Sequence, residues 1–369
     1  MTKLRLGLLF GGRSVEHEVS IVSASAILRA FDPSRYDVSL IMIDPEGRWH
    51  LTSPSNMADP ASMRAQPEVV LRGDGSGGRL IAVDPAKAHG FQEHIIDVFF
   101  PILHGRGGED GALQGLLELA EVPYVGSGVL SSAVQMDKDF AKRTLQAAGL
   151  PVLPWVTLRS SELEKEVAVV VKQIQSKLSL PAFIKPANSG SSVGISKATD
   201  LHSLTSSLEE AAAYDEKIIV ERAVKAREIE VAVLGDETGE ASLPGEIIPS
   251  HDFYDYEAKY QDQKTKLIVP AEVSKTLTLK LQGMAVQAYE VLEARGMARV
   301  DFLVEAESET IWINELNSLP GFTSGSMYPR LWAESGLPFS ALLDRLVQLA
   351  QARHARRARL RTGAPPGHL

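Results

Sequence analysis

Two neighbouring segments near the carboxyl end of the chain constrain its fold most strongly. Residues 298–304 and 310–316 are rich in β-branched, aromatic and other apolar side chains, and only residues 305–309 separate them. Two strand-like runs with so short a connection predict an antiparallel β-hairpin. We therefore expect at least one antiparallel sheet in this part of the chain.

Four polar side chains are expected to gather on this hairpin. Side chains alternate between the faces of a strand, so Arg299 and Asp301 share one face, as do Glu315 and Asn317 on the second strand. The short connection places Asp301 opposite residues 313–315. Facing carboxylates repel each other unless a cation lies between them, and hard oxygen ligands suit magnesium. The pattern favours a metal site, with the solvent face of an amphipathic hairpin as the alternative.

The first third of the chain has the pattern of an α/β domain. Residues 4–10, 38–43 and 95–100 are strand-like, and a glycine turn after the first of them leads into a helical pattern, with another helix expected near 112–121. We expect a small parallel sheet. A dinucleotide-dependent dehydrogenase can begin in the same way, but this turn lacks the Gly-x-Gly-x-x-Gly spacing.

A second region follows a helix expected at residues 131–148. It contains strands near 182–185 and 217–221, and a third region begins at 228–234. The loop at 188–194 is rich in glycine and serine and follows Lys185. Such a loop lets backbone amides approach phosphate oxygens, although a plain hairpin with a surface lysine has the same pattern.

Three other segments are candidate ligand sites. Glu16 lies at the start of a helix, where it could cap the helix or receive a ligand ammonium group. The glycine-rich residues 104–111 follow a strand, as ligand-binding loops of α/β folds do, or form a simple loop. The irregular, aromatic residues 253–260 suggest a lid or a packed surface loop.

Composition limits the class of protein. The 369 residues are enough for two or three domains, and 47 acidic against 38 basic residues argue against a general nucleic-acid binder. The absence of cysteine excludes disulfides and thiolate nucleophiles. We expect no export signal and no membrane span, and hence a cytoplasmic protein. The arginines from 353 to 361 are expected to be solvated in a fraying helix end.

Five motifs together resemble the D-alanine:D-alanine ligase family of the ATP-grasp superfamily, from Lys3 to Leu349. They are Gly-Gly-Arg-Ser-Val-Glu-His-Glu-Val-Ser at 11–20, Leu-His-Gly-Arg-Gly-Gly-Glu-Asp-Gly at 103–111, Gly-Ser-Ser-Val-Gly at 190–194, Tyr-Asp-Tyr-Glu-Ala-Lys-Tyr at 254–260 and Asn-Glu-Leu-Asn-Ser-Leu-Pro-Gly at 314–321. They occur in the order found in that family.

The resemblance implies an ATP-grasp fold, α/β and α+β, with a Rossmann-like amino-terminal domain. The implied domains are a substrate-binding domain (1–126), a central subdomain (127–222), a carboxyl-terminal subdomain with the metal site and lid (223–352) and a flexible tail (353–369). ATP would lie between the last two subdomains. Its implied contacts are Lys138, Lys185, Gly190, Ser191, Ser192, Val193, Glu221, Arg222, Ala223, Val224, Glu228 and Lys259.

The resemblance also implies a catalytic and substrate site. Its implied residues are Glu16, His104, Ser191, Tyr260, Arg299, Gly321 and Ser326, with Asp301, Glu315 and Asn317 on two Mg²⁺ ions for which Mn²⁺ could substitute. Glu16 would hold the ammonium of the first D-alanine, and Ser326 the carboxylate of the second. Ser189 and Gly325 stand where some members have glutamate and histidine, so the details of the second substrate site are open.

The implied reaction joins two D-alanine molecules through an acyl phosphate. The partners are then D-alanine and ATP, with no nucleic acid and no membrane, and the family implies a homodimer for peptidoglycan precursor synthesis. A ligase that uses D-lactate or D-serine as second substrate is a related alternative, and Tyr260 argues against the lactate form. A catalytically silent nucleotide-binding module is disfavoured because Asp301 and Glu315 are present.

Overall fold

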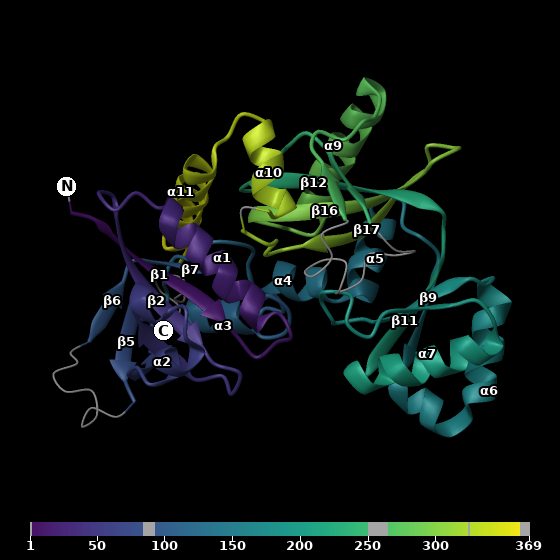
Figure 1. Ribbon diagram of the computed structural model, residues 1–369, viewed down its shortest axis with the longest axis horizontal. Helices are drawn as coiled ribbons and strands as arrows, with labels where there is room; N and C mark the ends of the chain where they lie inside the picture. The colour runs from purple at the N-terminus through teal and green to yellow at the C-terminus, as the bar shows by residue number, and fades with distance from the viewer. Residues whose placement is uncertain (1, 84–92, 250–264, 324, 362–369) are drawn as a thin grey trace, which may run out of the picture.

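The described residues form three β-sheets, each accompanied by helices (Figure 1). The computed structural model describes residues 2–83, 93–249, 265–323 and 325–361, without the side chains of 164–166. The sheets follow one another along the chain, which agrees with the predicted order of regions. No helix among these residues is long and apolar enough to cross a membrane.

The amino-terminal sheet has the strand order β6-β5-β4-β3-β2-β1-β7. Its elements are β1 (Leu4–Gly11), α1 (His17–Ala30), β2 (Tyr36–Ile43), β3 (Trp49–Thr52), η1 (Pro54–Asn56), α2 (Pro60–Arg64), β4 (Glu68–Leu71), β5 (Gly78–Ala82), β6 (His94–Ile96), β7 (Val98–Pro101) and α3 (Ala112–Leu119). The predicted strands and helices near β1, β2 and α3 are confirmed.

The small parallel sheet expected from the sequence is present as β2, β1 and β7, and four further strands extend it. Only β2, β1 and β7 run parallel, whereas β3 to β6 are antiparallel. The turn between β2 and β3, closed by Asp44 and Gly47, is too short for a parallel crossover. The single strand expected at 95–100 is interrupted at Asp97, whose carboxylate accepts hydrogen bonds from Arg5, one of them from its backbone amide at 2.9 Å.

The central sheet is antiparallel, in the order β10-β9-β11-β8. The elements of this region are α4 (Val129–Met136), α5 (Lys138–Ala147), β8 (Trp155–Arg159), α6 (Ser160–Lys177), β9 (Ala182–Pro186), β10 (Ser196–Ala198), α7 (Leu201–Tyr214) and β11 (Lys217–Arg222). The single helix expected at 131–148 is broken at Asp137, whose side chain caps α5 through the amides of Asp139 and Phe140. The break puts Lys138 in the first turn of a helix.

The third sheet has the order β15-β14-β12-β16-β17, with β13 paired to β12. Its elements are β12 (Ala226–Gly235), β13 (Gly239–Ala241), β14 (Gly245–Ile248), β15 (Lys266–Ile268), α9 (Lys275–Val291), β16 (Gly296–Glu305), β17 (Ile311–Asn317), α10 (Met327–Glu334) and α11 (Phe339–Arg357). The predicted hairpin is therefore confirmed as β16 and β17.

One apolar core joins the first and third sheets. Phe10 and Phe100 of the amino-terminal sheet share a buried cluster with Phe322, Tyr328 and Leu346. α11 also contacts α1 and lies beside it in Figure 1. This shared core fixes the loops after β1 and β7 relative to the loop after β17.

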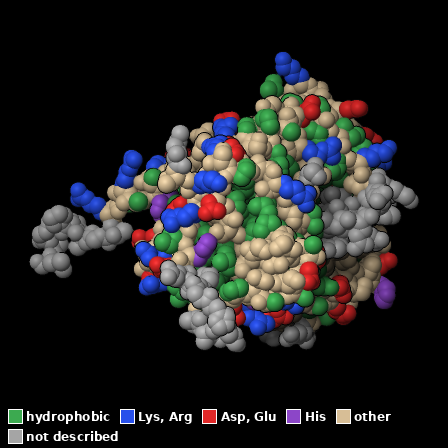
Figure 2. Space-filling model, turned by 60° about the vertical axis from the view of Figure 1, so that its left-hand side comes forward, with side chains coloured by type: hydrophobic (Ala, Val, Ile, Leu, Met, Phe, Trp, Pro, Cys, Tyr) green, Lys and Arg blue, Asp and Glu red, His purple; other side chains and the backbone are tan. Residues whose placement is uncertain are grey.

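The arginines at the end of α11 make specific contacts. Arg353 stacks on the ring of Tyr124 at 4.4 Å and donates a hydrogen bond to its carbonyl oxygen, Arg356 pairs with Asp236, and Arg357 pairs with an acidic side chain of α3. The expectation that these side chains are merely solvated is wrong for all three, because α11 lies against its neighbours. On the face drawn in Figure 2, basic and acidic side chains are intermixed.

Candidate active site

The β16–β17 hairpin presents its polar side chains as predicted. Arg299 lies opposite Asn317, and Asp301 lies opposite Glu315. The register shifts just after Asp301, because Phe302 pairs with residue 313 and leaves Asn314 as an additional residue. The Asn314 side chain contacts the central sheet, where Lys185 Nζ donates to its Oδ1 at 3.4 Å. The sequence analysis did not predict this bulge.

Cations of the protein neutralise the hairpin carboxylates. Arg299 donates hydrogen bonds of 2.7 Å to both oxygens of Asp301 and lies 3.0 Å from Glu230. Burial alone would lower the pKa of Arg299, but Asp301 and Glu230 hold it well above its usual value. Glu315 lies 3.6 Å from Lys138 Nζ. The repulsion expected between facing carboxylates is thus offset by two basic side chains.

The donor set on the hairpin fits magnesium. Among the residues described, no three His, Cys, Asp or Glu side chains are grouped so as to hold a metal ion. Asp301 and Glu315 with the amide oxygen of Asn317 would supply few hard ligands and leave positions for water and phosphate, as magnesium prefers. The side-chain nitrogen of Asn317 donates a hydrogen bond to Asp301 at 2.9 Å. To bind a cation, the Asn317 side chain would have to turn so that its amide oxygen faces the ion.

The glycine–serine loop, residues 188–194, connects β9 to β10 and contacts Lys138 at the start of α5. Lys138 Nζ donates to the carbonyl oxygen of Ser189 at 2.7 Å, and its backbone amide donates to the carbonyl before the loop. Ser191 and Ser192 have φ values of +48° and +57°, in the left-handed region that residues other than glycine rarely adopt. Contacts to the rest of the protein must hold this loop in a strained conformation.

A buried group of three charges lies beside this loop. Glu221 on β11 pairs with Lys185 Nζ at 2.6 Å and with Lys142 on α5. Burial would raise the pKa of Glu221, but the two lysines lower it, and Glu221 in turn raises the pKa of Lys185 against the effect of burial. Burial lowers the pKa of Lys142. The sequence analysis missed Lys142, although it follows Lys138 by one helical turn.

The segment after Glu221 connects the central and third sheets. The Arg222 guanidinium lies 5.6 Å from the centre of the Trp312 ring, and the amide of Ala223 donates to a carbonyl next to β9. Val224 lies just before β12, which carries Glu228, and the Glu228 charge acts on Lys185. The structure thus brings Glu221 and the charge of Glu228 to Lys185, whereas the contacts of residues 221–224 with a nucleotide stay a prediction.

Glu16 does not cap α1. It occupies the N-cap position, but its side chain makes no capping hydrogen bond and accepts one from Ser191 across the cavity. A β-carbon on Gly190 would lie 3.0 Å from Glu16 Oε2, so the loop backbone approaches this carboxylate closely. Glu16 and Ser191, predicted from motifs far apart in sequence, are in contact.

His104 and Glu109 connect the loop after β7 to the loop after β17. His104 is hydrogen-bonded through Nδ1 to the carbonyl of Leu319 at 3.0 Å, while its buried Nε2 has no hydrogen-bond partner among the described residues. Glu109 accepts from the amides of Gly105 and Leu319 at 2.8 and 3.1 Å. Burial raises the pKa of Glu109 to about 6. Glu109 lies in one of the five motifs but was not predicted as a site residue.

Gly321 and Ser326 approach each other closely in the loop after β17. A β-carbon on Gly321 would lie 2.9 Å from Ser326 Oγ. Ser326 Oγ accepts a hydrogen bond from the amide of Thr323 at 3.0 Å. Phe322 is fully buried against Phe100 and holds the turn to the shared core. Gly321 and the Ser326 hydroxyl are therefore held close together in this loop.

A cavity of about 620 Å³ joins most of these groups. Its lining includes Glu16, His104, Glu109, Lys138, Gly190, Ser191, Ser192, Arg299, Glu315, Asn317, Gly321 and Ser326. Asp301 is not in the lining but contacts it through Arg299 and Asn317, and Lys185 and Glu221 are also outside it. Lys259 and Tyr260, predicted as part of a lid, lie outside the described residues.

Comparisons with known proteins agree with this arrangement. Family models described as the D-ala D-ala ligase N-terminus and C-terminus match residues 5–127 and 144–348. A D-alanine–D-alanine ligase of Caldicellulosiruptor bescii is 47% identical over 351 residues, covering 95% of this chain and 96% of that protein. D-alanine–D-alanine ligase A of Escherichia coli is 46% identical over 367 residues, covering 98% and 100%.

Solved structures are similar over nearly the whole chain. The D-alanine–D-alanine ligase from Coxiella burnetii has a TM-score of 0.83 at 36% identity and covers 97% of each chain. The VanG D-Ala:D-Ser ligase from Enterococcus faecalis has a TM-score of 0.84 at 34% identity, covering 95% of this chain and 100% of that one.

A mixed amino-terminal sheet followed by two antiparallel sheets with charged residues between them is the ATP-grasp fold, here in an ATP-dependent ligase. The chain belongs to the D-alanine–D-alanine ligase family. The resemblance inferred from five sequence motifs is thereby confirmed.

Proposed function

We propose that the protein joins two D-alanine molecules into D-alanyl-D-alanine, with D-alanyl phosphate as the intermediate and ADP and phosphate as the other products. One observation carries the proposal. A single cavity contains an acid that can receive an ammonium group, a lysine beside a glycine–serine loop, and an acidic hairpin, namely Glu16, Lys138 and Glu315.

ATP is proposed to bind between the central and third sheets. Lys138 and Lys185 would neutralise its phosphates, and residues 190–193 would donate backbone amides to them. Residues 221–224 would hold the adenine and Glu228 the ribose. The pairing of Lys185 with Glu221 supports this, because Glu221 keeps Lys185 charged inside the protein.

Magnesium is proposed on Asp301, Glu315 and Asn317, where two ions would neutralise charge on the terminal phosphates. The supporting observation is the oxygen donor set on one face of the hairpin. Arg299, which already pairs with Asp301, can also stabilise a developing oxyanion together with the Gly321 amide.

The two substrates are proposed to occupy opposite ends of the cavity. Glu16 would hold the ammonium of the first D-alanine with His104 nearby, and Ser326 would bind the carboxylate of the second. A carboxylate oxygen of the first D-alanine attacks the γ-phosphorus, and ADP leaves. The amine of the second D-alanine then attacks the acyl carbon and expels phosphate. Closure over the cavity, with Lys259 and Tyr260 in the proposed lid, would protect the acyl phosphate from water.

The wider role proposed here is peptidoglycan precursor synthesis by a cytoplasmic homodimer. The same family resemblance supports domains at 1–126, 127–222 and 223–352, with 353–369 as a tail. The first boundary agrees with the family model that ends at residue 127.

A D-serine-using ligase is the second candidate, because the VanG D-Ala:D-Ser ligase is among the structures this chain resembles. The distinguishing experiment gives the protein ATP, Mg²⁺ and D-alanine with equimolar D-serine or D-lactate, and separates the products by mass. We expect D-alanyl-D-alanine to dominate and L-alanine alone to give no dipeptide. A D-alanyl-D-serine product in excess would replace the proposal with the second candidate.

A further inference from the structure

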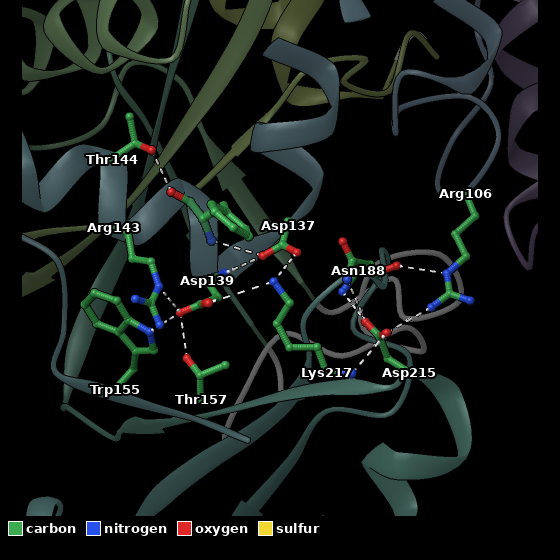
Figure 3. A network of polar contacts seen from close by, with 11 residues as sticks. Arg106, Asp137, Asp139, Arg143, Thr144, Trp155, Thr157, Asn188, Asp215 and Lys217 are labelled. Atoms are coloured by element: carbon green, nitrogen blue, oxygen red, sulfur yellow. Dashed lines mark hydrogen bonds and ion pairs between the residues drawn. The ribbon is translucent and has the colours of Figure 1, made fainter. Parts of the chain in front are cut away.

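An arginine of the amino-terminal region reaches the base of the glycine–serine loop (Figure 3). Arg106 lies in the connection between β7 and α3. Its Nη2 donates to the carbonyl oxygen of Tyr214 at 3.1 Å and lies 3.3 Å from Asp215, and its Nε donates to the carbonyl oxygen of Asn188 at 3.4 Å. One guanidinium therefore contacts two segments of the central region.

Asp215 transmits this contact to the loop. Its side chain is 7% exposed, and its Oδ2 accepts hydrogen bonds from the Asn188 backbone amide at 2.6 Å and from the Asn188 side chain at 3.0 Å. Tyr214 is the last residue of α7, where the helix dipole favours a cation. Asn188, the first residue of the loop, is thus held by Asp215, which is held in turn by Arg106.

The same amino-terminal region also holds the tip of the loop. Ser191, in its strained conformation, donates to Glu16, while Arg106 holds the base. Glu16 lies in the loop after β1, and Arg106 lies in the loop after β7. These two strands are neighbours in the amino-terminal sheet and share one core. The loop can move away from the amino-terminal sheet only if both contacts break.

The network continues from the loop to the start of α5. The backbone amide of Lys217 donates to Asp215 Oδ1 at 3.3 Å, and its ammonium group pairs with Asp137 and lies 3.8 Å from Asp139. Those two acids flank Lys138. Figure 3 shows the chain of contacts from Arg106 to these acids, and it shows Arg143 beside Asp139 on the same helix.

We propose that Arg106 is a positioning residue that keeps the glycine–serine loop closed while the acyl phosphate exists. The inference rests on the proposed ligase reaction. An opened loop admits water, which would hydrolyse D-alanyl phosphate to D-alanine and phosphate before the second amine attacks. Loss of Arg106 should therefore separate phosphate release from dipeptide formation, without removing a group that touches the reacting atoms.

The test compares Arg106→Gln with Arg143→Gln. Both arginines are more than half exposed and both substitutions remove one positive charge, but Arg143 pairs with Asp139 at 2.9 Å within its own helix. Phosphate and dipeptide are measured together at saturating D-alanine, and the KM for ATP is measured separately. A thermal melt of each variant checks folding.

For wild type and Arg143→Gln we expect one phosphate per dipeptide. For Arg106→Gln we expect phosphate in clear excess over dipeptide and a KM for ATP raised about fivefold, the size of an exposed ion pair. If Arg106→Gln releases one phosphate per dipeptide and has the wild-type KM for ATP, the inference is wrong and the proposed function stands. If wild type makes no dipeptide, the proposed function fails, and this inference with it.

Discussion

The buried charges around Glu221 and the acidic side chains of the β16–β17 hairpin differ in exposure. Glu221 and Lys142 have side chains only 1% and 3% exposed, whereas Glu315 on the hairpin is 26% exposed and faces the cavity. The first group is neutralised inside the protein, while the second lies where a ligand can replace its partners. Substitution of Lys142 in the first region should therefore reduce mainly stability, and substitution of Glu315 in the second should reduce mainly catalysis.

Glu315→Gln should have the largest effect. Removing one charge from the proposed metal ligands should lower kcat/KM about thousandfold, or roughly 4 kcal/mol in transition-state stabilisation. The melting temperature should stay within a few degrees of wild type, because Glu315 has only a 3.6 Å contact with Lys138. Steady-state kinetics over a range of Mg²⁺ concentrations measures the effect.

The control for this substitution is Glu307→Gln, in the exposed turn of the same hairpin. It should retain wild-type kinetics. Equal losses in the two variants would mean that hairpin charge in general, rather than the acids facing the cavity, determines the rate.

Lys142→Met should lower the stability of the protein, in contrast to Glu315→Gln. It removes one of the two cations on Glu221 inside the protein, so the free energy of unfolding should fall by about 3 kcal/mol. Urea unfolding measures this, with Lys197→Met on the exposed side of β10 as the control. An unchanged free energy of unfolding for Lys142→Met would remove the proposed difference between the two regions.

The raised pKa of Glu109, a carboxyl group that lines the cavity, should make the stability of the protein depend on pH. Burial raises the pKa of Glu109 to about 6, from 4.5 in an exposed group. The folded protein therefore binds this proton more tightly than the unfolded chain, so the stabilising contribution is complete below pH 4.5 and is lost as pH rises to 6. By linkage the loss is about 2 kcal/mol.

The measurement for Glu109 is the difference in free energy of unfolding between wild type and Glu109→Gln. As pH rises from 4.5 to 7, wild type should lose about 2 kcal/mol of unfolding free energy relative to Glu109→Gln. A difference that does not change with pH would show that Glu109 titrates as an exposed acid does.

Ser191→Ala should have the smallest effect among these variants. It removes the hydrogen bond from the loop to Glu16, which should raise the KM for D-alanine about tenfold, or roughly 1.4 kcal/mol. Ser206→Ala, on the exposed face of α7, serves as the control. Initial rates over a range of D-alanine concentrations distinguish the two, and identical KM values would contradict a role for this contact.

The sequence predicted features that depend on neighbouring residues. The hairpin register follows from side-chain alternation and a short connection, so Asp301 was expected near Glu315. The break at Asp137 was missed because the helical pattern continues past it, although an aspartate before two free amides is a capping signal. The bulge at Asn314 was missed because its cause lies in packing against another sheet.

Contacts between distant segments could not be predicted from patterns. A helix and two strands bring together Lys142, Lys185 and Glu221. The sequence around each of these residues gives no sign of the other two. The antiparallel strands β3 to β6 are short and carry little alternation, so the sequence did not predict that they extend the parallel part of the sheet. Glu16 and Ser191, which meet in the structure, were assigned to one site only through the family resemblance.

The central claim is that the carboxylate of one D-alanine is activated as an acyl phosphate in this cavity. The direct test uses D-alanine labelled with ¹⁸O in its carboxylate, together with ATP and Mg²⁺, and follows the label by mass spectrometry of the products. The account predicts one ¹⁸O atom in each phosphate released with dipeptide, because the attacking oxygen leaves with the phosphate. Dipeptide formation accompanied by unlabelled phosphate would contradict it.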